Sequence, residues 1–272
     1  MSVGRLCGVV DMSRQNYYKQ RCERDRRAVD EALVLSLVRR ERALQPFLGV
    51  RKLLVILRDE FAMSGVSIGR DRFFALLSRH GLLIHRRRKY CRTTDSRHGF
   101  GVYSNLLKDV TLSGPYQALV SDITYIRTDE GFMYLSLVMD AYSRAIVGYD
   151  CSDSLECEGA LRSLSMALRG LPVGSRPIHH SDRGSQYCCG AYIEKLRRAG
   201  FHISMTEENH CYENGQAERL NGILKQEYGL GGRFRRKSEV RRSVCEAVNL
   251  YNCRRPHQCL DYRCPMEVHL AA

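Results

Sequence analysis

The chain has 272 residues, a hydrophobic content of 44% and a formal net charge of +13. These values are typical of a globular protein with a substantial buried core, and they exclude wholesale disorder. No apolar run approaches the roughly 18–20 residues that span a bilayer, and the first ten residues lack the pattern of a signal peptide. We therefore expect a cytoplasmic protein of two or three domains with no membrane partner.

The positive charge is concentrated towards the two ends of the chain. Residues 1–100 contain 22 Lys and Arg against 10 Asp and Glu, and residues 233–263 contain 9 against 3. Residues 101–232 between them are mildly acidic, with 12 against 16. One basic run is often only a solvated surface. Two basic runs that flank an acidic centre favour a protein whose basic surfaces bind a polyanion and whose central region holds a metal.

Twelve cysteines raise the question of a zinc site or a disulfide framework. No pair has the C-x-x-C spacing, and the cluster of His257, Cys259, Cys264 and His269 matches no standard zinc finger. We interpret the cysteines as reduced and mostly as small core residues.

Residues 1–92 predict a helical region. A short helix is expected to begin after its cap Ser13, and residues 29–44 form an amphipathic pattern. The apolar positions of that pattern are Val29, Leu33, Leu37 and Leu44. No sustained heptads are present, so no coiled coil is predicted.

A helix-turn-helix is expected next. Its first helix spans residues 49–60 and its second spans 68–80, capped by Ser67. The predicted apolar face of the second helix holds Phe73, Phe74, Leu76 and Leu77. Basic residues at its start lie where a recognition helix enters the major groove, and the basic run that follows favours phosphate contacts. The candidate DNA-binding residues here are Arg70, Arg72, Arg86, Arg87, Arg88 and Lys89. Two short helices that only pack together are the alternative.

Residues 93–113 are polar with several Gly and Ser, and they predict a linker. Residues 114–230 predict a mixed sheet covered by helices, an α/β fold, because three closely connected strands precede alternating helices and strands. The expected strands are 118–127, 132–140, 144–151, 177–181 and 201–205, and the expected helices are 155–169, 190–199 and 214–228. A basic extension, 231–272, contains a last helix at about 238–252, with Val240, Val244, Val248 and Tyr251 on its apolar face.

Three acidic residues of the central region are hard to explain by solubility. Asp122 interrupts an apolar strand, Asp182 directly follows another strand, and Glu218 lies on a predicted helix with 35 residues between it and Asp182. Carboxylates that converge repel one another and raise each other's pKa, so such a cluster is expected around a cation. Hard oxygen ligands of this type suit Mg²⁺ or Mn²⁺.

This acid pattern and the segments around it resemble the DDE transposases and retroviral integrases, and within them the insertion-sequence-three family of bacterial transposases. The matching segments are Asp122-Ile-Thr-Tyr-Ile126, Tyr134-Leu-Ser-Leu-Val138, Asp140-Ala-Tyr-Ser-Arg144, Ile146-Val-Gly148 and His180-Ser-Asp-Arg-Gly-Ser-Gln-Tyr187. Where the family often has Asp-Asn-Ala before the last acid, this chain has Glu213-Asn214-Gly215. The role of Glu213 is therefore open, with helix capping favoured over a metal contact.

The resemblance implies a ribonuclease-H-like fold and a polynucleotidyl transferase that cleaves and joins double-stranded DNA at the ends of an insertion sequence. It implies that Asp122 bridges two Mg²⁺ or Mn²⁺ ions, that Asp182 completes one site and that Glu218 completes the other. It also implies a homo-oligomer on DNA, a nucleoid-associated location, and a partner frame upstream with a helix-turn-helix and a coiled coil.

Several neighbours of the acids have competing interpretations. Lys225, two turns after Glu218, is a candidate contact for a DNA phosphate or a solvated lysine. Asp140 favours a turn-capping or ion-paired role, and His179 and His180 favour packing over metal ligation. At the level of function, the alternatives are a DNA-binding repressor or relic with an inactive core, and a nuclease that hydrolyses without joining.

Overall fold

The computed structural model describes residues 2–84, 101–108, 110–207 and 214–271. It divides into two compact units, one with residues up to 84 except 45–47, and one with residues 45–47 and the rest of the chain. Arg86, Arg87, Arg88, Lys89, Glu213 and the side chain of Val29 lie outside the described part. None of the helices in the described ranges combines the length and apolar character that crossing a membrane requires.

The first unit is helical, as predicted. Its elements are α1 (Val3–Val9), α2 (Arg14–Leu44), α3 (Val50–Ile56), α4 (Arg58–Met63) and α5 (Arg70–Arg79). Its core consists mainly of Val34, Val38, Leu48, Leu53, Leu57, Phe61, Phe73, Leu76 and Leu77. The two helices expected between residues 13 and 44 are one helix of 31 residues, because neither Gly nor Pro interrupts this stretch. Ser13 caps it as expected, and its hydroxyl accepts a 3.1 Å bond from the amide of Asn16.

The helix-turn-helix region departs from the prediction in detail. The first predicted helix is broken at Leu57 into α3 and α4. The second begins at Arg70 after an extended Gly69, so Ser67 is not its cap. Phe74 is 50% exposed because the buried stripe of α5, Phe73 with Leu76 and Leu77, is too narrow to include it. Leu44, also predicted as apolar-face, is 50% exposed at the end of α2.

The second unit is built on a mixed sheet. Its elements are β1 (Ala118–Thr128), β2 (Gly131–Asp140), β3 (Ile146–Ser152), α6 (Cys157–Leu168), β4 (Ile178–Ser181), α7 (Ser185–Cys188), α8 (Gly190–Arg198), β5 (His202–Met205), α10 (Gly215–Glu227), β6 (Arg233–Phe234), α11 (Lys237–Cys253), η1 (Gln258–Leu260) and α12 (Pro265–Leu270). The strand order is β3-β2-β1-β4-β5, and β6 pairs with the far end of β1. Strands β1 to β3 are antiparallel neighbours, whereas β4 and β5 run parallel to β1. This confirms the predicted ribonuclease-H-like arrangement.

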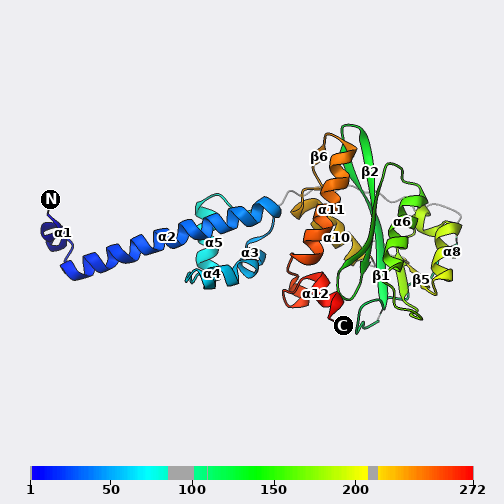
Figure 1. The fold of residues 1–272 in the computed structure, drawn as a ribbon, viewed down its shortest axis with the longest axis horizontal. Coiled ribbons are helices and arrows are strands. Elements are labelled where there is room, and N and C mark those ends of the chain that lie inside the picture. Colours follow the sequence, from blue (N-terminus) through cyan, green and yellow to red (C-terminus); the bar gives the residue numbers. More distant parts are fainter. Residues whose placement is uncertain (1, 85–100, 109, 208–213, 272) are drawn as a thin grey trace. The chain divides into compact units, whose positions relative to one another are not determined.

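Helices cover both faces of the sheet (Figure 1). On one face, Val120 and Ile126 of β1 share an apolar cluster with residues of α10 and α11. On the other face, Leu119 of β1 and Val138 of β2 pack with residues of α6 and α8. Because side chains alternate along a strand, β1 is the central element of both layers.

The C-terminal segment belongs to the same core as the sheet. The apolar face of α11 is buried as predicted, through Val240, Val244, Val248 and Tyr251. The side chain of Asn252 bonds both the amide and the carbonyl of Ile146, each at 2.9 Å, and so holds the edge strand β3. Arg255 donates two hydrogen bonds, of 2.8 and 3.0 Å, to the carboxylate of Glu227 at the end of α10.

The described part of the predicted linker contacts the sheet at its outermost strand on the β5 side. The amide of Leu106 donates a 2.8 Å bond to the hydroxyl of Ser204 in β5, and the amide of Asn105 donates a 3.0 Å bond to Glu207. Leu107 and Leu112 pack against the apolar cluster under α10 and α11. The contacts give this polar stretch a fixed path on the second unit.

Candidate active site

Asp122 and Asp182 are placed by the pairing of β1 with β4. The two strands are parallel, and Val120 is the register partner of His180. Asp122 and Asp182 each lie two residues beyond these partners, so equal steps along parallel strands bring them to the same end of the pair. Beyond this point β4 has ended and β6 has not begun, so β1 has an open edge beside Asp122.

Helix α10 brings Glu218 to this edge. Two asparagines tie the helix to β1: Asn214 donates a 3.1 Å bond to the carbonyl of Ser121, and Asn221 donates a 2.7 Å bond to Oδ2 of Asp122. Glu218 lies between the two asparagines, in the first turn of the helix. Neither hydrogen bond was predicted from the sequence, because spacing along a helix does not reveal which strand the helix packs against.

The electrostatics of the site show that the three carboxylates are near neighbours. Burial, and after it the charges of Asp182 and Glu218, together raise the pKa of Asp122 to about 7, against hydrogen bonds from Ile123 and Asn221 that lower it. Partial burial and the charge of Asp182 also raise the pKa of Glu218. Without a counterion, therefore, the group resists full ionisation near neutral pH.

The three acids have the oxygen ligands that a hard cation prefers, although their side chains are not arranged as a metal site. In the part of the chain that the structure describes, no three His, Cys, Asp or Glu side chains lie close enough to form a metal site as they stand. The three acids nevertheless offer carboxylate oxygens. Besides the carboxylates, the buried amide oxygen of Asn221 has no hydrogen-bond partner among the described residues. Such a donor set suits Mg²⁺ or Mn²⁺.

The competing residues near the acids have structural partners. Asp140 is fully buried and accepts bonds from the amide and hydroxyl of Ser143, at 2.7 and 2.8 Å, and from the amide of Tyr116 at 2.7 Å. Of the two roles expected for Asp140, turn capping and ion pairing, these hydrogen bonds show turn capping. His179 is packed between the hydroxyls of Ser121 and Tyr192, each 2.9 Å from Nε2. Burial lowers the pKa of His179 to about 3, so the ring is neutral at physiological pH.

The candidate DNA-binding residues occupy different settings. Arg70 and Arg72 are exposed at the start of α5, where Arg70 pairs with Asp71 at 2.8 Å and Arg72 lies 3.9 Å from Glu31. Lys225 of α10 has its Nζ 5.8 Å from the ring centre of Tyr125. Arg70 and Arg72 belong to the first unit and the three acids to the second.

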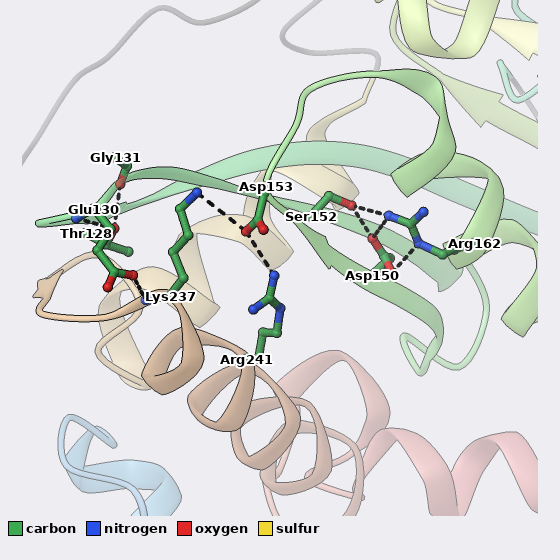
Figure 2. Close-up of polar contacts among 9 residues, drawn as sticks. All are labelled: Thr128, Glu130, Gly131, Asp150, Ser152, Asp153, Arg162, Lys237 and Arg241. Carbon is green, nitrogen blue, oxygen red and sulfur yellow. Dashed lines mark hydrogen bonds and ion pairs between the residues drawn. The ribbon is translucent and has the colours of Figure 1, made fainter.

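Part of the basic charge near the C-terminus is paired within the protein. Lys237 and Arg241, one turn apart on α11, both contact Asp153, at 3.7 and 2.9 Å (Figure 2). Arg235 and Arg236, just before the helix, are exposed. A charge count along the sequence therefore overstates how much of this segment's positive charge faces a ligand.

Comparison with known proteins identifies the family. Two family models, both described as integrase core domain, match residues 113–211 and 199–265. The insertion element IS600 31 kDa protein of Shigella sonnei is 34% identical, covering 93% of both chains. The transposase InsF for insertion sequence IS3A of Escherichia coli K12 is 36% identical over 74% of this chain and 70% of its own length. The chain belongs to the insertion-sequence-three family of transposases. The resemblance predicted from the motifs is thus confirmed.

Within this family, the transposase for insertion sequence element IS629 of Shigella sonnei is 31% identical over 99% of this chain and 92% of its own length. Among solved structures, the integrase catalytic core of HTLV-2 with magnesium has a TM-score of 0.45 at 16% identity, covering 57% of this chain and 97% of its own. A chain of the simian T-cell lymphotropic virus intasome has a TM-score of 0.49 at 15% identity, covering 82% and 70%. The two integrase-core matches on this transposase include all three acids and the whole of α11.

Proposed function

We propose that this chain cleaves and joins DNA at the ends of an insertion sequence by metal-dependent phosphoryl transfer. The observation that carries the proposal is the gathering of Asp122, Asp182 and Glu218 at the open edge of β1, in a member of a transposase family. A DNA-binding repressor with an inactive core is the second candidate, but it gives no reason to keep three mutually repelling carboxylates together.

The three acids are proposed to hold divalent cations, two Mg²⁺ or Mn²⁺, with Asp122 shared between them. When bound, such ions activate the attacking oxygen and stabilise the leaving one. The residues of the chain orient the carboxylates and balance the charge of the cations. The carboxylates supply the negative charge, and Asn221 orients Asp122 through its 2.7 Å bond. The raised pKa of Asp122 supports the proposal, because a neighbouring cation offsets both the burial and the repulsion that raise it.

Two nucleophiles act on DNA phosphates in succession, first water and then a 3′-hydroxyl of the DNA. Water attacks first and frees a 3′-hydroxyl, which then attacks the target strand, so no Ser or Tyr nucleophile is required. Lys225 is proposed to hold a phosphate beside the reacting bond, because it lies one turn beyond Asn221 on α10. Double-stranded DNA is proposed to contact Arg70, Arg72 and the basic run Arg86, Arg87, Arg88 and Lys89.

Oligomerisation on DNA and the upstream partner frame remain part of the proposal, because exchange between two DNA ends needs more than one active site. The proposed domain limits are those of the sequence: a DNA-binding region at 1–92, a linker at 93–113, a catalytic core at 114–230 and an extension at 231–272.

The test is cleavage of DNA that carries the element's own ends, in Mg²⁺ or Mn²⁺, with the upstream frame product supplied. Asp122→Asn, Asp182→Asn and Glu218→Gln keep side-chain size but remove one ligand charge each, and each is expected to abolish cleavage while DNA binding persists. Glu194→Gln, an exposed carboxylate of α8, is the matched control and is expected to cleave normally. An acid whose variant cleaves like wild type has no place in the site.

A further inference from the structure

Three aromatic rings lie together at the outer end of the β1–β2 hairpin, and we call Tyr125, Phe132 and Tyr134 the hairpin platform. Tyr125 is the register partner of Tyr134. The Tyr125 ring centre is 5.9 Å from that of Tyr134 and 6.1 Å from that of Phe132, in edge-to-face contacts. Phe132 is 46% exposed, and both tyrosines are half-buried. The rings therefore form a surface and not a closed core.

Two cations accompany the rings. The guanidinium carbon of Arg127 lies 5.7 Å from the ring centre of Phe132, and Nζ of Lys225 lies 5.8 Å from that of Tyr125. Arg127 is exposed and forms no ion pair within the described ranges. The acids at the hairpin turn have other partners, since Asp129 pairs with Arg233 and Glu130 accepts a 2.9 Å bond from the amide of Lys237. The platform is consequently positive as well as aromatic.

The hairpin turn that presents the platform is held from several directions (Figure 2). The hydroxyl of Thr128 donates a 2.7 Å bond to the carbonyl of Gly131 and accepts a 3.1 Å bond from the amide of Glu130. Strand β6 pairs with the end of β1 on its other side. A surface that is ordered before binding loses little conformational entropy when a ligand arrives.

The platform is connected to the proposed active site through Lys225, at the open edge of β1. Tyr125 follows Asp122 by three residues on β1, so its side chain points to the opposite face of the sheet, because side chains alternate along a strand. Lys225, which contacts Tyr125, lies one turn after Asn221, whose amide bonds Asp122. A strand whose phosphate reacts at the acids therefore has its neighbouring nucleotides within reach of the rings where it crosses this edge.

We propose that the hairpin platform stacks on unpaired bases of the DNA strand next to the reacting phosphate, while Arg127 and Lys225 contact its backbone. This inference rests on the proposed function for the identity of the nucleic acid. Exposed aromatic faces with adjacent cations are how proteins hold single-stranded nucleic acid without sequence readout. Cross-strand packing accounts for the half-buried tyrosine pair, but it leaves unexplained why Phe132 and Arg127 are exposed together.

The test uses the full chain in EDTA, so that binding is read without cleavage. The probes are a duplex with a few unpaired nucleotides that carry 5-iododeoxyuridine, and a blunt duplex of the same sequence. Photo-crosslinks are mapped by mass spectrometry, and affinities are measured by fluorescence anisotropy. The inference predicts crosslinks within residues 125–134. It also predicts an affinity loss of about tenfold for the unpaired probe in Phe132→Leu, with little change for the blunt duplex.

Phe132→Trp keeps an aromatic face and is expected to restore binding of the unpaired probe, which a purely structural role of Phe132 does not predict. Arg127→Ala is expected to lower the affinity for the unpaired probe more than Arg198→Ala does. Arg198 is an exposed arginine of α8 and serves as the control. Crosslinks confined to other segments, or equal losses for both probes in Phe132→Leu, would overturn the inference. Because no cleavage is measured, this failure is distinct from failure of the acid variants, which tests the proposed function itself.

Discussion

The side-chain amide of Asn221 donates a 2.7 Å hydrogen bond to Oδ2 of Asp122 and so joins α10 to the central strand β1. Glu218 lies one turn earlier on the same helix, so this bond sets the distance between the first and last acids of the proposed site. The start of α10, one turn before Glu218, is fixed by its N-cap Asn214, which donates a hydrogen bond to the carbonyl of Ser121.

Asn221→Ala is expected to lower the rate of DNA cleavage by about 10- to 100-fold, because partners that orient metal ligands typically contribute this much. Raising the metal concentration should recover part of the activity, and a titration of rate against Mn²⁺ measures it. Asn249→Ala, on the exposed face of α11, serves as the control. An unchanged metal titration for Asn221→Ala would show that the bond does not organise the site.

The pH dependence of metal binding follows from Asp122. Its pKa is raised from 3.8 to about 7 in the metal-free protein, so a cation must displace a proton below pH 7. Apparent affinity for Mn²⁺ is expected to fall by about tenfold per pH unit below that value and to level off above it. Isothermal titration calorimetry between pH 5 and 8, with proton release measured in two buffers, tests this. Affinity that is flat across the range would contradict the assignment.

The same shift has a consequence for stability. A carboxyl group whose pKa is raised on folding favours the folded state fully below its unfolded pKa, and this contribution is lost as pH rises through the folded pKa. Asp122→Asn is therefore expected to raise the melting temperature of the metal-free protein at pH 8 and to have little effect near pH 4. Asp59→Asn, an exposed residue of α4, is expected to change neither value. A lower melting temperature for Asp122→Asn at pH 8 would contradict a raised pKa of Asp122 in the folded protein.

Asn252 tests whether the C-terminal segment is integral to the catalytic unit. Asn252→Ala leaves the buried amide and carbonyl of Ile146 without their partner, which is expected to lower the free energy of unfolding by about 2–3 kcal/mol. Urea unfolding measures the change, with Asn249→Ala as the exposed control three residues away. Equal stability of the two variants would mean that α11 packs on the sheet without needing this contact.

The helical unit is expected to supply salt-dependent DNA affinity. Arg70→Glu combined with Arg72→Glu should weaken duplex binding and reduce the slope of log affinity against log salt by about 2, because two DNA phosphates are then no longer neutralised. Arg51→Glu combined with Arg58→Glu, at exposed arginines of α3 and α4, is the matched double charge reversal. A similar weakening in both proteins would assign the effect to net charge and not to the start of α5.

Much of the sheet unit follows from local sequence patterns. The alternating apolar residues of β1 and the period of α11 are long enough to predict both elements and their buried faces. α7 and β6, with four and two residues, are too short to produce a periodic signal. The break at Leu57 between α3 and α4 carries no Gly or Pro, so nothing local predicts it.

In the candidate site, too, the sequence predicts the residues that have a local pattern and does not predict the tertiary contacts. Spacing and strand context were sufficient to nominate Asp122, Asp182 and Glu218. The bond from Asn221 to Asp122 joins residues 99 positions apart, and it depends on which edge of β1 the helix packs against. The pairing of Lys237 and Arg241 with Asp153 is likewise tertiary, which is why a count of charges was a poor guide to the basic extension.

The central claim is that the three acids form a site that joins DNA and does not merely hydrolyse it. The most direct measurement supplies a pre-cleaved donor end with a free 3′-hydroxyl, a target duplex, Mg²⁺ or Mn²⁺ and the upstream frame product, and then assays for joined strands. We expect joined products with the wild-type chain, their disappearance with Glu218→Gln, and normal joining with Glu194→Gln. Hydrolysis without joining, or joining that persists in Glu218→Gln, would contradict the account.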